Sequence, residues 1–198
     1  MSKQFYIFIG RSGCGKGTQA ELLKDYLEKE KKQPTIHITT GGGFRDFIES
    51  GSYLASISKK INETGGLQPE FLAVWNWANI LIKDIKGGET ILLDGSPRKI
   101  FESRVLNNAI SFLGYEKPTV IYMDVKESWA RERLNGRGRA DDNSKEIDAR
   151  MNWFEKDVVP VLDDYMHDSR YSFIHINGEQ AVEEVHKEIK KKLDLSLS

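Results

Sequence analysis

A glycine-rich segment near the start of the chain has the residue types that bind phosphate. Gly10, Gly13 and Gly15 are interleaved with small residues and followed by Lys16, after an apolar run and before a segment with helical spacing. Glycines let the backbone curl so that successive N–H groups point at phosphate oxygens, and a helix N-terminus adds partial positive charge. Lys16 can reach the β- and γ-phosphates of a nucleotide. The predicted nucleotide-binding loop comprises Gly10, Ser12, Gly13, Cys14, Gly15, Lys16, Gly17 and Thr18.

This loop departs from the common pattern G-x-x-x-x-G-K-[ST] at the position that ligates magnesium. Gly17 stands there, and Thr18 follows one position later as an alternative ligand. Asp94 ends the apolar run Ile91–Leu93 and is placed to hold water on magnesium, the role of the second acid in phosphate-loop enzymes. We therefore expect magnesium to be held mostly through water and nucleotide phosphates. Cys14 is expected to be a small filler residue, because no chemistry here needs a thiolate.

Arginines follow glycine turns in two later segments. The turn Gly95–Pro97 leads into Arg98, whose planar guanidinium can grip a phosphate through paired hydrogen bonds. Residues 131–142 carry four arginines within nine positions of a nearly neutral chain. Gly136 and Gly138 interrupt this segment and predict that its arginines lie on a mobile loop rather than on a helix. Any positive field in this chain is therefore local.

Short apolar runs alternate with segments of helical spacing, and these elements must position the candidate residues. The runs span residues 5–9, 35–38, 90–93, 120–125 and 172–176, and are typical of parallel strands covered on both faces. The alternation predicts an α/β fold with a doubly wound, parallel five-stranded sheet and helices on both faces. The expected apolar helix faces are Ala20, Leu23 and Leu27; Phe71, Val74 and Ala78, with Trp75 beside them and Ile82 beyond; and Val182, Val185, Ile189 and Leu193.

Two stretches interrupt this alternation and are expected to be insertions at the carboxyl edge of the sheet, where such folds bind ligands. They comprise residues 39–67 and 134–144. Residues 1–38, 68–133 and 145–198 are expected to form the core of a single domain, which a length of 198 residues favours.

Composition excludes several classes of protein. Lys and Arg total 29 against 30 Asp and Glu, and a net charge of -1 argues against a general nucleic-acid binder. Cys14 is the one cysteine, so neither a disulfide framework nor a cysteine-built zinc site is expected. Apolar stretches fall short of the roughly 20 residues that span a membrane, and the first residues lack the features of a signal peptide. We expect a cytoplasmic protein without a nucleic-acid or membrane partner.

Four segments together resemble the nucleoside monophosphate kinases, and adenylate kinase in particular. Residues 10–18 are similar to the family's G-x-x-G-x-G-K-G-T loop, and residues 94–98 to its D-G-[FY]-P-R motif. Residues 38–45 are similar to S-T-G-D-x-x-R, and residues 133–142 to R-L-x-x-R followed by R-x-D-D. The matches cover nearly the whole chain in order. The resemblance implies a phosphate-loop NTPase fold, ATP with Mg²⁺, a nucleoside monophosphate acceptor, a short lid without zinc, and a monomer.

The resemblance also implies roles for particular residues. ATP would contact the loop residues together with Arg133, Arg137 and Gly178, with Arg133 stacked on the base. The acceptor would contact Thr40, Gly41, Arg45, Gln68, Gly95, Arg98, Glu102, Arg139 and Arg150. The expected reaction is direct in-line transfer, catalysed by positioning and by charge neutralisation from Lys16, Arg98, Arg137, Arg139 and Arg150.

Glu102 departs from the family pattern at a position that reads the acceptor base. Adenylate kinases have glutamine there, and an amide matches the acceptor and donor that adenine presents. An ionised carboxylate only accepts, which suits the donors of GMP or CMP, although a protonated Glu102 could imitate glutamine. Ser96, in place of the motif's aromatic residue, and Gly42, in place of its aspartate, are further departures. AMP is the expected acceptor, with GMP or a cytidine monophosphate as the alternative.

A protein of another class is a nucleotide sensor that binds ATP without transferring phosphate. The arginines matched to the acceptor site argue against it, because a sensor needs no acceptor clamp. His37 and His175 lie in strand runs and are expected to be packed or edge residues. Trp75 and Trp77 are expected to pack in the core, and Asp141 and Asp142 to brace lid arginines.

Overall fold

The five apolar runs pair side by side into one parallel sheet, as the sequence predicts. The computed structural model describes residues 3–138 and 143–196, with side chains described up to residue 193. The strands are β1 (Phe5–Gly10), β2 (Thr35–Thr39), β3 (Thr90–Asp94), β4 (Thr119–Asp124) and β5 (Ser172–Asn177). Their order is β2-β3-β1-β4-β5, and all neighbours run parallel. Because β1 is central, the loop that follows it lies at the middle of the carboxyl edge.

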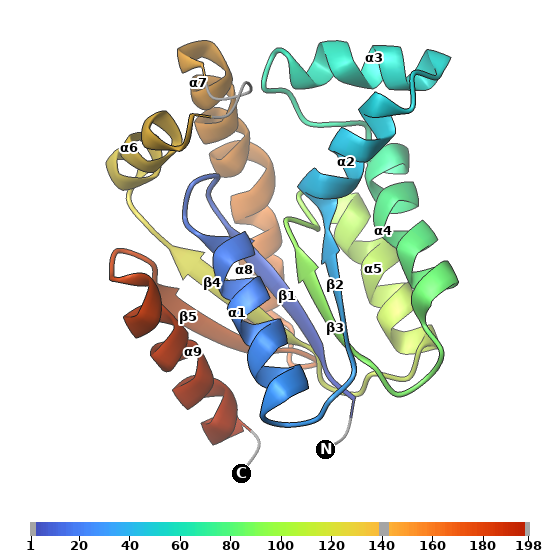
Figure 1. Cartoon of the computed structure of the whole chain (residues 1–198), viewed down its shortest axis with the longest axis vertical. Helices are drawn as coiled ribbons and strands as arrows, with labels where there is room; N and C mark the ends of the chain where they lie inside the picture. The colour runs from blue at the N-terminus through green and yellow to red at the C-terminus, as the bar shows by residue number, and fades with distance from the viewer. Residues whose placement is uncertain (1–2, 139–142, 197–198) are drawn as a thin grey trace.

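Helices follow the strands and cover both faces of the sheet (Figure 1). The helices of the described chain are α1 (Lys16–Lys29), α2 (Thr40–Glu49), α3 (Tyr53–Asn62), α4 (Glu70–Asp84), α5 (Ile100–Phe112), α6 (Glu127–Arg137), α7 (Ser144–Trp153), the π-helical turn η1 (Phe154–Val158), α8 (Val159–His167) and α9 (Val182–Ser196). None of these helices is long and apolar enough to cross a membrane.

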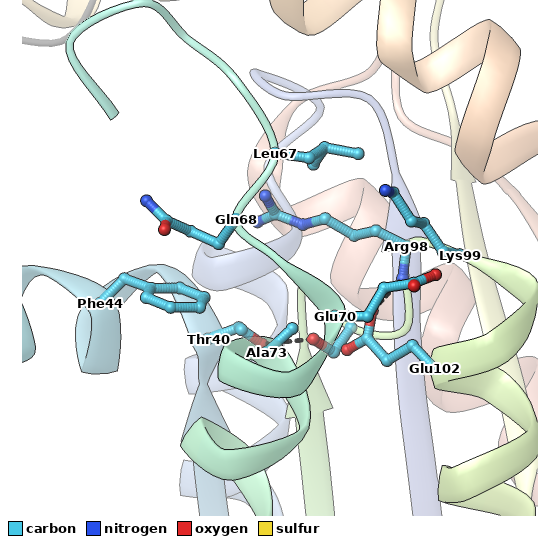
Figure 2. A pocket seen from close by; sticks show the side chains of 10 residues that line it. Thr40, Phe44, Leu67, Gln68, Glu70, Ala73, Arg98, Lys99 and Glu102 are labelled. Atoms are coloured by element: carbon cyan, nitrogen blue, oxygen red, sulfur yellow. Dashed lines mark hydrogen bonds between the residues drawn. The ribbon is translucent and has the colours of Figure 1, made fainter. Parts of the chain in front are cut away.

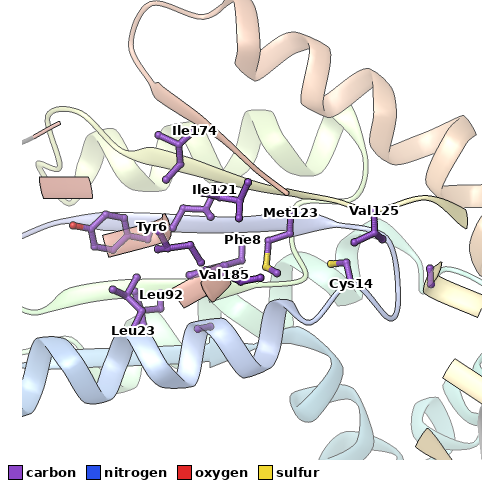
Figure 3. Close-up of a cluster of buried hydrophobic side chains, with 14 of the residues drawn as sticks. Tyr6, Phe8, Cys14, Leu23, Leu92, Ile121, Met123, Val125, Ile174 and Val185 are labelled. Atoms are coloured by element: carbon purple, nitrogen blue, oxygen red, sulfur yellow. The ribbon is translucent and has the colours of Figure 1, made fainter. Parts of the chain in front are cut away.

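Two apolar clusters hold the helices on the sheet. On one face, Leu23 of α1 and Val185 of α9 pack against Phe8 and Ile121 (Figure 3). On the other face, α4, α5 and α8 pack against the alternate residues of the same strands. Each central strand is therefore buried on both sides, which explains why the strand runs are continuously apolar.

The apolar face of α4 is only in part the one expected: Val74 and Ala78 pack against the core, but other residues differ. Phe71 is 61% exposed and Ile82 is 82% exposed, whereas Leu81 is only 6% exposed. Trp77 is buried as expected, but Trp75 lies on the partly exposed surface. Helix α4 is apolar nearly all round, so its sequence alone does not indicate which side faces the sheet.

The described parts of the two predicted insertions lie above the carboxyl edge of the sheet (Figure 1). Helices α2 and α3 rise beyond β2, and α6 and α7 lie beyond β4. The expectation of a helix break at Gly136 is wrong, because α6 continues through Gly136 and ends at Arg137, followed by the C-cap Gly138 with φ 66°. Arg131, Arg133 and Arg137 therefore belong to a helix rather than to a loop. Arg139, Asp141 and Asp142 lie outside the described residues.

Candidate active site

The loop between β1 and α1 has the backbone shape that a phosphate site requires. Gly13 and Gly15 have φ of 90° and 93°, a region that glycine adopts without strain. A side chain at Gly13 would also come within 2.7 Å of the Ala130 carbonyl oxygen. Gly15 caps α1, so the first N–H groups of that helix face into the loop.

Lys16 curls back over this loop. Its Nζ donates to the carbonyl oxygens of Gly10, at 2.9 Å, and Arg11, at 3.0 Å. The ammonium is therefore held at the mouth of the loop, among the backbone groups predicted to surround phosphate. Cys14 is buried beneath it, and burial raises the pKa of the thiol despite the nearby lysine. A neutral thiol suits the filler role expected of Cys14.

Asp94, at the end of β3, and Gly178, just after β5, come close to the loop. A side chain at Gly17 would put its Cβ 3.2 Å from Asp94 Oδ2. The carboxylate at the end of β3 thus faces the start of α1, and the absence of a side chain at Gly17 makes room for it. A Cβ at Gly178 would lie 3.4 Å from the Cys14 carbonyl oxygen and 2.6 Å from Val125 Cγ1. Predicted loop residues and the residue after β5 are therefore brought together.

Arg11 is a loop residue whose role the sequence reasoning missed. Its guanidinium lies 4.4 Å from the centre of the Phe154 ring, Nε donates to the Val125 carbonyl oxygen at 3.2 Å, and Nη2 pairs with Glu155. The loop is thereby tied to the π-helical turn that follows α7. An arginine inside a glycine-rich loop was the available signal, but its partners lie more than 100 residues away.

A second pocket opens beside this loop, between α2, α4 and the turn after β3 (Figure 2). About 310 Å³ of space, part of it open solvent, lies between its lining residues. Thr40 Oγ1 lies 3.0 Å from the Asp94 carbonyl oxygen and 2.9 Å from Ser96 Oγ, which joins the ends of β2 and β3. Its lining includes the predicted acceptor residues Thr40, Gln68, Arg98 and Glu102.

Arg98 extends across this pocket towards Leu67 and Gln68 (Figure 2). Its Nε donates to the Gly95 carbonyl oxygen at 2.7 Å. Burial lowers the pKa of Arg98; Glu102 and Asp94 oppose that effect, and the like charge of Arg150 adds to it. Arg150 is itself only 8% exposed. A half-buried arginine and a buried one that lie close together are an arrangement that an anion stabilises.

Glu102 lies at the floor of the same pocket and is 2% exposed. Its Oε2 accepts the Arg98 backbone N–H at 2.8 Å, while Oε1 is buried without a hydrogen-bond partner among the described residues. Burial raises the pKa of this carboxyl, although the Arg98 backbone N–H, the nearby Ser96 and Trp77 side chains and the charge of Arg98 oppose the shift. The environment therefore favours the protonated form more than water does.

Other predicted residues are placed less directly. Arg45 is exposed and does not line the pocket; its Nη1 lies near the first turn of α2, 3.6 Å from where a Gly41 Cβ would be. Arg133 and Arg137 are exposed on α6, with Arg133 5.8 Å from the centre of the Trp129 ring. The structure does not bring these three arginines into the pocket.

The histidines expected to be packed or edge residues have surface partners. His37 is largely buried and bonds Glu21 at 2.9 Å, and His175, on the edge strand β5, bonds Asp124 at 3.0 Å. Within the described chain, no three His, Cys, Asp or Glu side chains gather as a metal site.

A parallel sheet with a lysine-bearing phosphate loop and an adjacent arginine-lined pocket defines a phosphate-loop phosphotransferase with an acceptor site. The adenylate kinase family model matches residues 8–170. An adenylate kinase of Corynebacterium glutamicum (strain R) is 33% identical over 94% of this chain and 97% of its own length. Adenylate kinase 1 of Nostoc sp. (strain PCC 7120) is 30% identical over 94% of this chain and 97% of its own length. An adenylate kinase of Prochlorococcus marinus (strain SARG) is 30% identical over 96% of this chain and 99% of its own length.

The chain therefore belongs to the adenylate kinase family. It is a transferase of the nucleoside monophosphate kinase class. The sequence resemblance and the expected fold class are both confirmed.

Proposed function

We propose that this enzyme catalyses the reversible reaction of ATP and AMP to two ADP by direct in-line phosphoryl transfer. The observation that carries the proposal is the juxtaposition of two cationic phosphate sites around Asp94. Its carboxylate faces Gly17 of the ATP loop, and its carbonyl oxygen meets Thr40 of the acceptor pocket. The relatives named adenylate kinase support the choice of AMP.

The proposed chemistry depends on positioning. Lys16 and the loop N–H groups hold the β- and γ-phosphates of ATP, while Arg98 and Arg150 hold the acceptor phosphate. An oxygen of that phosphate attacks the γ-phosphorus, and the bond to the oxygen bridging to the β-phosphorus breaks. Since the acceptor oxygen is already anionic, no side chain has to remove a proton.

Residues above the sheet would complete this arrangement. Arg45 and Arg137 would reach the phosphates by movement of the segments that carry them, and such closure excludes water and suppresses hydrolysis of ATP. Arg139 is proposed to take part on the family resemblance alone. We propose residues 39–67 and 134–144 as the acceptor-binding insertion and the short lid, with the rest of the chain as the core.

The residues beside the loop fit a magnesium ion carried with ATP. Asp94 presents its carboxylate towards Gly17, and Thr18 is exposed one residue further along. Carboxylate and hydroxyl oxygens are the ligands that Mg²⁺ prefers, with water and phosphate oxygens filling the remaining positions. Magnesium supplies charge neutralisation of the phosphates when bound.

A second acceptor class is favoured by Glu102 alone. With Oε2 engaged by the Arg98 backbone, Oε1 is the oxygen left to meet a base. A protonated Oε1 can donate to the N1 atom of adenine, whereas an ionised one accepts from the N–H groups of guanine or cytosine. Because burial raises the pKa of Glu102, we place AMP first and GMP or CMP second.

A coupled assay with ATP, Mg²⁺ and each of AMP, GMP, CMP and UMP tests the proposal. AMP as the substrate with the highest kcat/KM supports it. A preference for GMP or CMP would show that the ionised carboxylate reads the base. Tight ATP binding without transfer to any monophosphate would favour a sensor. Sedimentation of the active enzyme tests the further proposal that it acts as a monomer, and fractionation of cells tests a cytoplasmic location.

A further inference from the structure

Trp153 contacts two separated parts of the proposed acceptor site. It is the last residue of α7, three positions after Arg150. Its indole Nε1 donates to the Gly65 carbonyl oxygen at 3.0 Å, across 88 residues of sequence. The Arg98 guanidinium lies 5.1 Å from the centre of its ring.

The contact with Gly65 is part of a close backbone approach. Gly65 has φ 67° and is buried, and a Cβ there would lie 2.6 Å from both Cα and the carbonyl oxygen of Glu146. The turn that ends the 39–67 segment therefore rests directly on the first turn of α7, and Trp153 binds the same turn from the other end of that helix. Only a residue without a side chain fits between them.

The contact with Arg98 constrains a long and otherwise adaptable side chain. Stacking over the indole, together with the bond from Nε to Gly95, fixes the plane of the guanidinium. Arg150 projects from the same helix as Trp153, so one helix sets the position of both buried arginines.

We propose that Trp153 is a positioning residue for the acceptor: it orients Arg98 beside Arg150 and holds the end of the acceptor-binding insertion against α7. This inference rests on the proposed function, because it assigns the acceptor phosphate to these arginines. It predicts an effect confined to the acceptor, since both contacts are with acceptor-side residues.

Two substitutions separate the two contacts. Trp153→Phe keeps an aromatic ring beside Arg98 but loses the N–H to Gly65, and should raise the KM for the acceptor about 2–10-fold, as expected for one lost hydrogen bond. Trp153→Leu removes both contacts and should raise it by a further factor of about 3 or more. In both variants the KM for ATP should stay within about twofold of the wild-type value.

Trp75→Phe is the matched control. Trp75 also packs against the acceptor-binding insertion, with the centre of its ring 5.2 Å from that of Phe47. Among the described residues, the ring contact of Trp75 is with Phe47 and not with Arg98. This variant should keep both KM values. Unfolding midpoints of all three variants report whether a change is simply loss of folding.

The outcomes distinguish this inference from the proposed function. Unchanged KM for the acceptor in Trp153→Leu, or equal increases in the KM for ATP and acceptor, would overturn the positioning role. If the wild type transfers no phosphate, calorimetric binding of AMP replaces the kinetic assay: weaker binding by Trp153→Leu supports the inference while the proposed function fails. Equal binding by both proteins, or no binding by the wild type, refutes it.

Discussion

At the scale of single residues, Lys16 carries the most direct link between sequence and chemistry. In this structure its ammonium is held by two loop carbonyl oxygens, the position from which it can transfer its hydrogen bonds to phosphate. The two carbonyls are neutral acceptors, so exchange for a doubly charged phosphate is favourable.

Lys16→Met removes this charge while keeping most of the side-chain length. We expect kcat to fall about 10²–10³-fold, as for removal of one preorganised donor from a transition state. Steady-state kinetics with the acceptor at saturation measures it. More than a tenth of wild-type turnover in the variant would contradict the proposed mechanism.

Glu102 leads to a prediction about pH. Burial raises its pKa, so the native state binds the proton more tightly than the unfolded chain. Stability should therefore fall as pH rises from about 4 through the raised pKa. Glu102→Gln should increase the free energy of unfolding at pH 7 by about 1–2 kcal/mol, and the gain should vanish below about pH 4.

The same variant tests how the base is read. If protonated Glu102 reads AMP, the wild-type kcat/KM for AMP should decrease as pH rises, and Glu102→Gln should remove that decrease. The pH profile of the variant is the control for ionisation of the nucleotide. An AMP activity that rises with pH only in the wild type would instead indicate recognition by the carboxylate.

At the scale of elements, the turn η1 joins the acceptor side to the ATP loop. Arg11 bonds the Val125 carbonyl oxygen and pairs with Glu155, whose side chain is 54% exposed. Exposed ion pairs contribute little, whereas a bond from a charged group to a partly buried carbonyl contributes more. Arg11 should therefore matter to loop geometry mainly through Val125.

Arg11→Met should raise the KM for ATP about 3–10-fold with little change for the acceptor. Glu155→Gln should change it by less than about twofold. Initial-rate kinetics on the two variants and their double mutant separates these contributions. A larger effect from Glu155→Gln than from Arg11→Met would show that the ion pair is the important contact.

Helix α4 offers a matched pair of neighbouring aliphatic residues. Leu81 is 6% exposed and packs in the core, while Ile82 is 82% exposed. Leu81→Ala should lower the free energy of unfolding by about 2–5 kcal/mol, and Ile82→Ala should change it by less than about 0.5 kcal/mol. Urea denaturation measures both. Equal losses would mean that α4 presents a different face to the sheet.

At the scale of the whole molecule, the acceptor site brings the like charges of Arg98 and Arg150 near each other, while Glu102 and Asp94 offset that effect at Arg98. These residues come from a loop after β3 and from α7, so an anion bound by both would join those elements. Stability and acceptor binding are therefore linked.

Arg98→Met tests this linkage. AMP at about 100 times its Kd should raise the free energy of unfolding of the wild type by about 2.7 kcal/mol, and the variant should gain less than about 0.5 kcal/mol. Without ligand, the variant should be less stable than the wild type, because it loses the bond from Nε to Gly95 and the contact with Trp153. Denaturation with and without AMP measures both, and equal gains from AMP would refute the assignment.

The sequence by itself determined the parallel sheet, the phosphate loop and the acceptor turn. These features depend on local patterns: continuous apolar runs, glycines before Lys16, and Asp94 followed by a turn into Arg98. Because the carboxyl ends of parallel strands share one edge, the loops that follow them had to meet there.

Only the tertiary structure decided which side of α4 is buried and how deeply the Glu102 carboxyl lies. It also decided that Arg11 and Trp153 join distant segments. Trp153 and Gly65 are 88 residues apart, and no local pattern encodes their contact. Such contacts follow from the relative placement of whole elements, which depends on packing across both faces of the sheet rather than on the spacing of neighbouring residues.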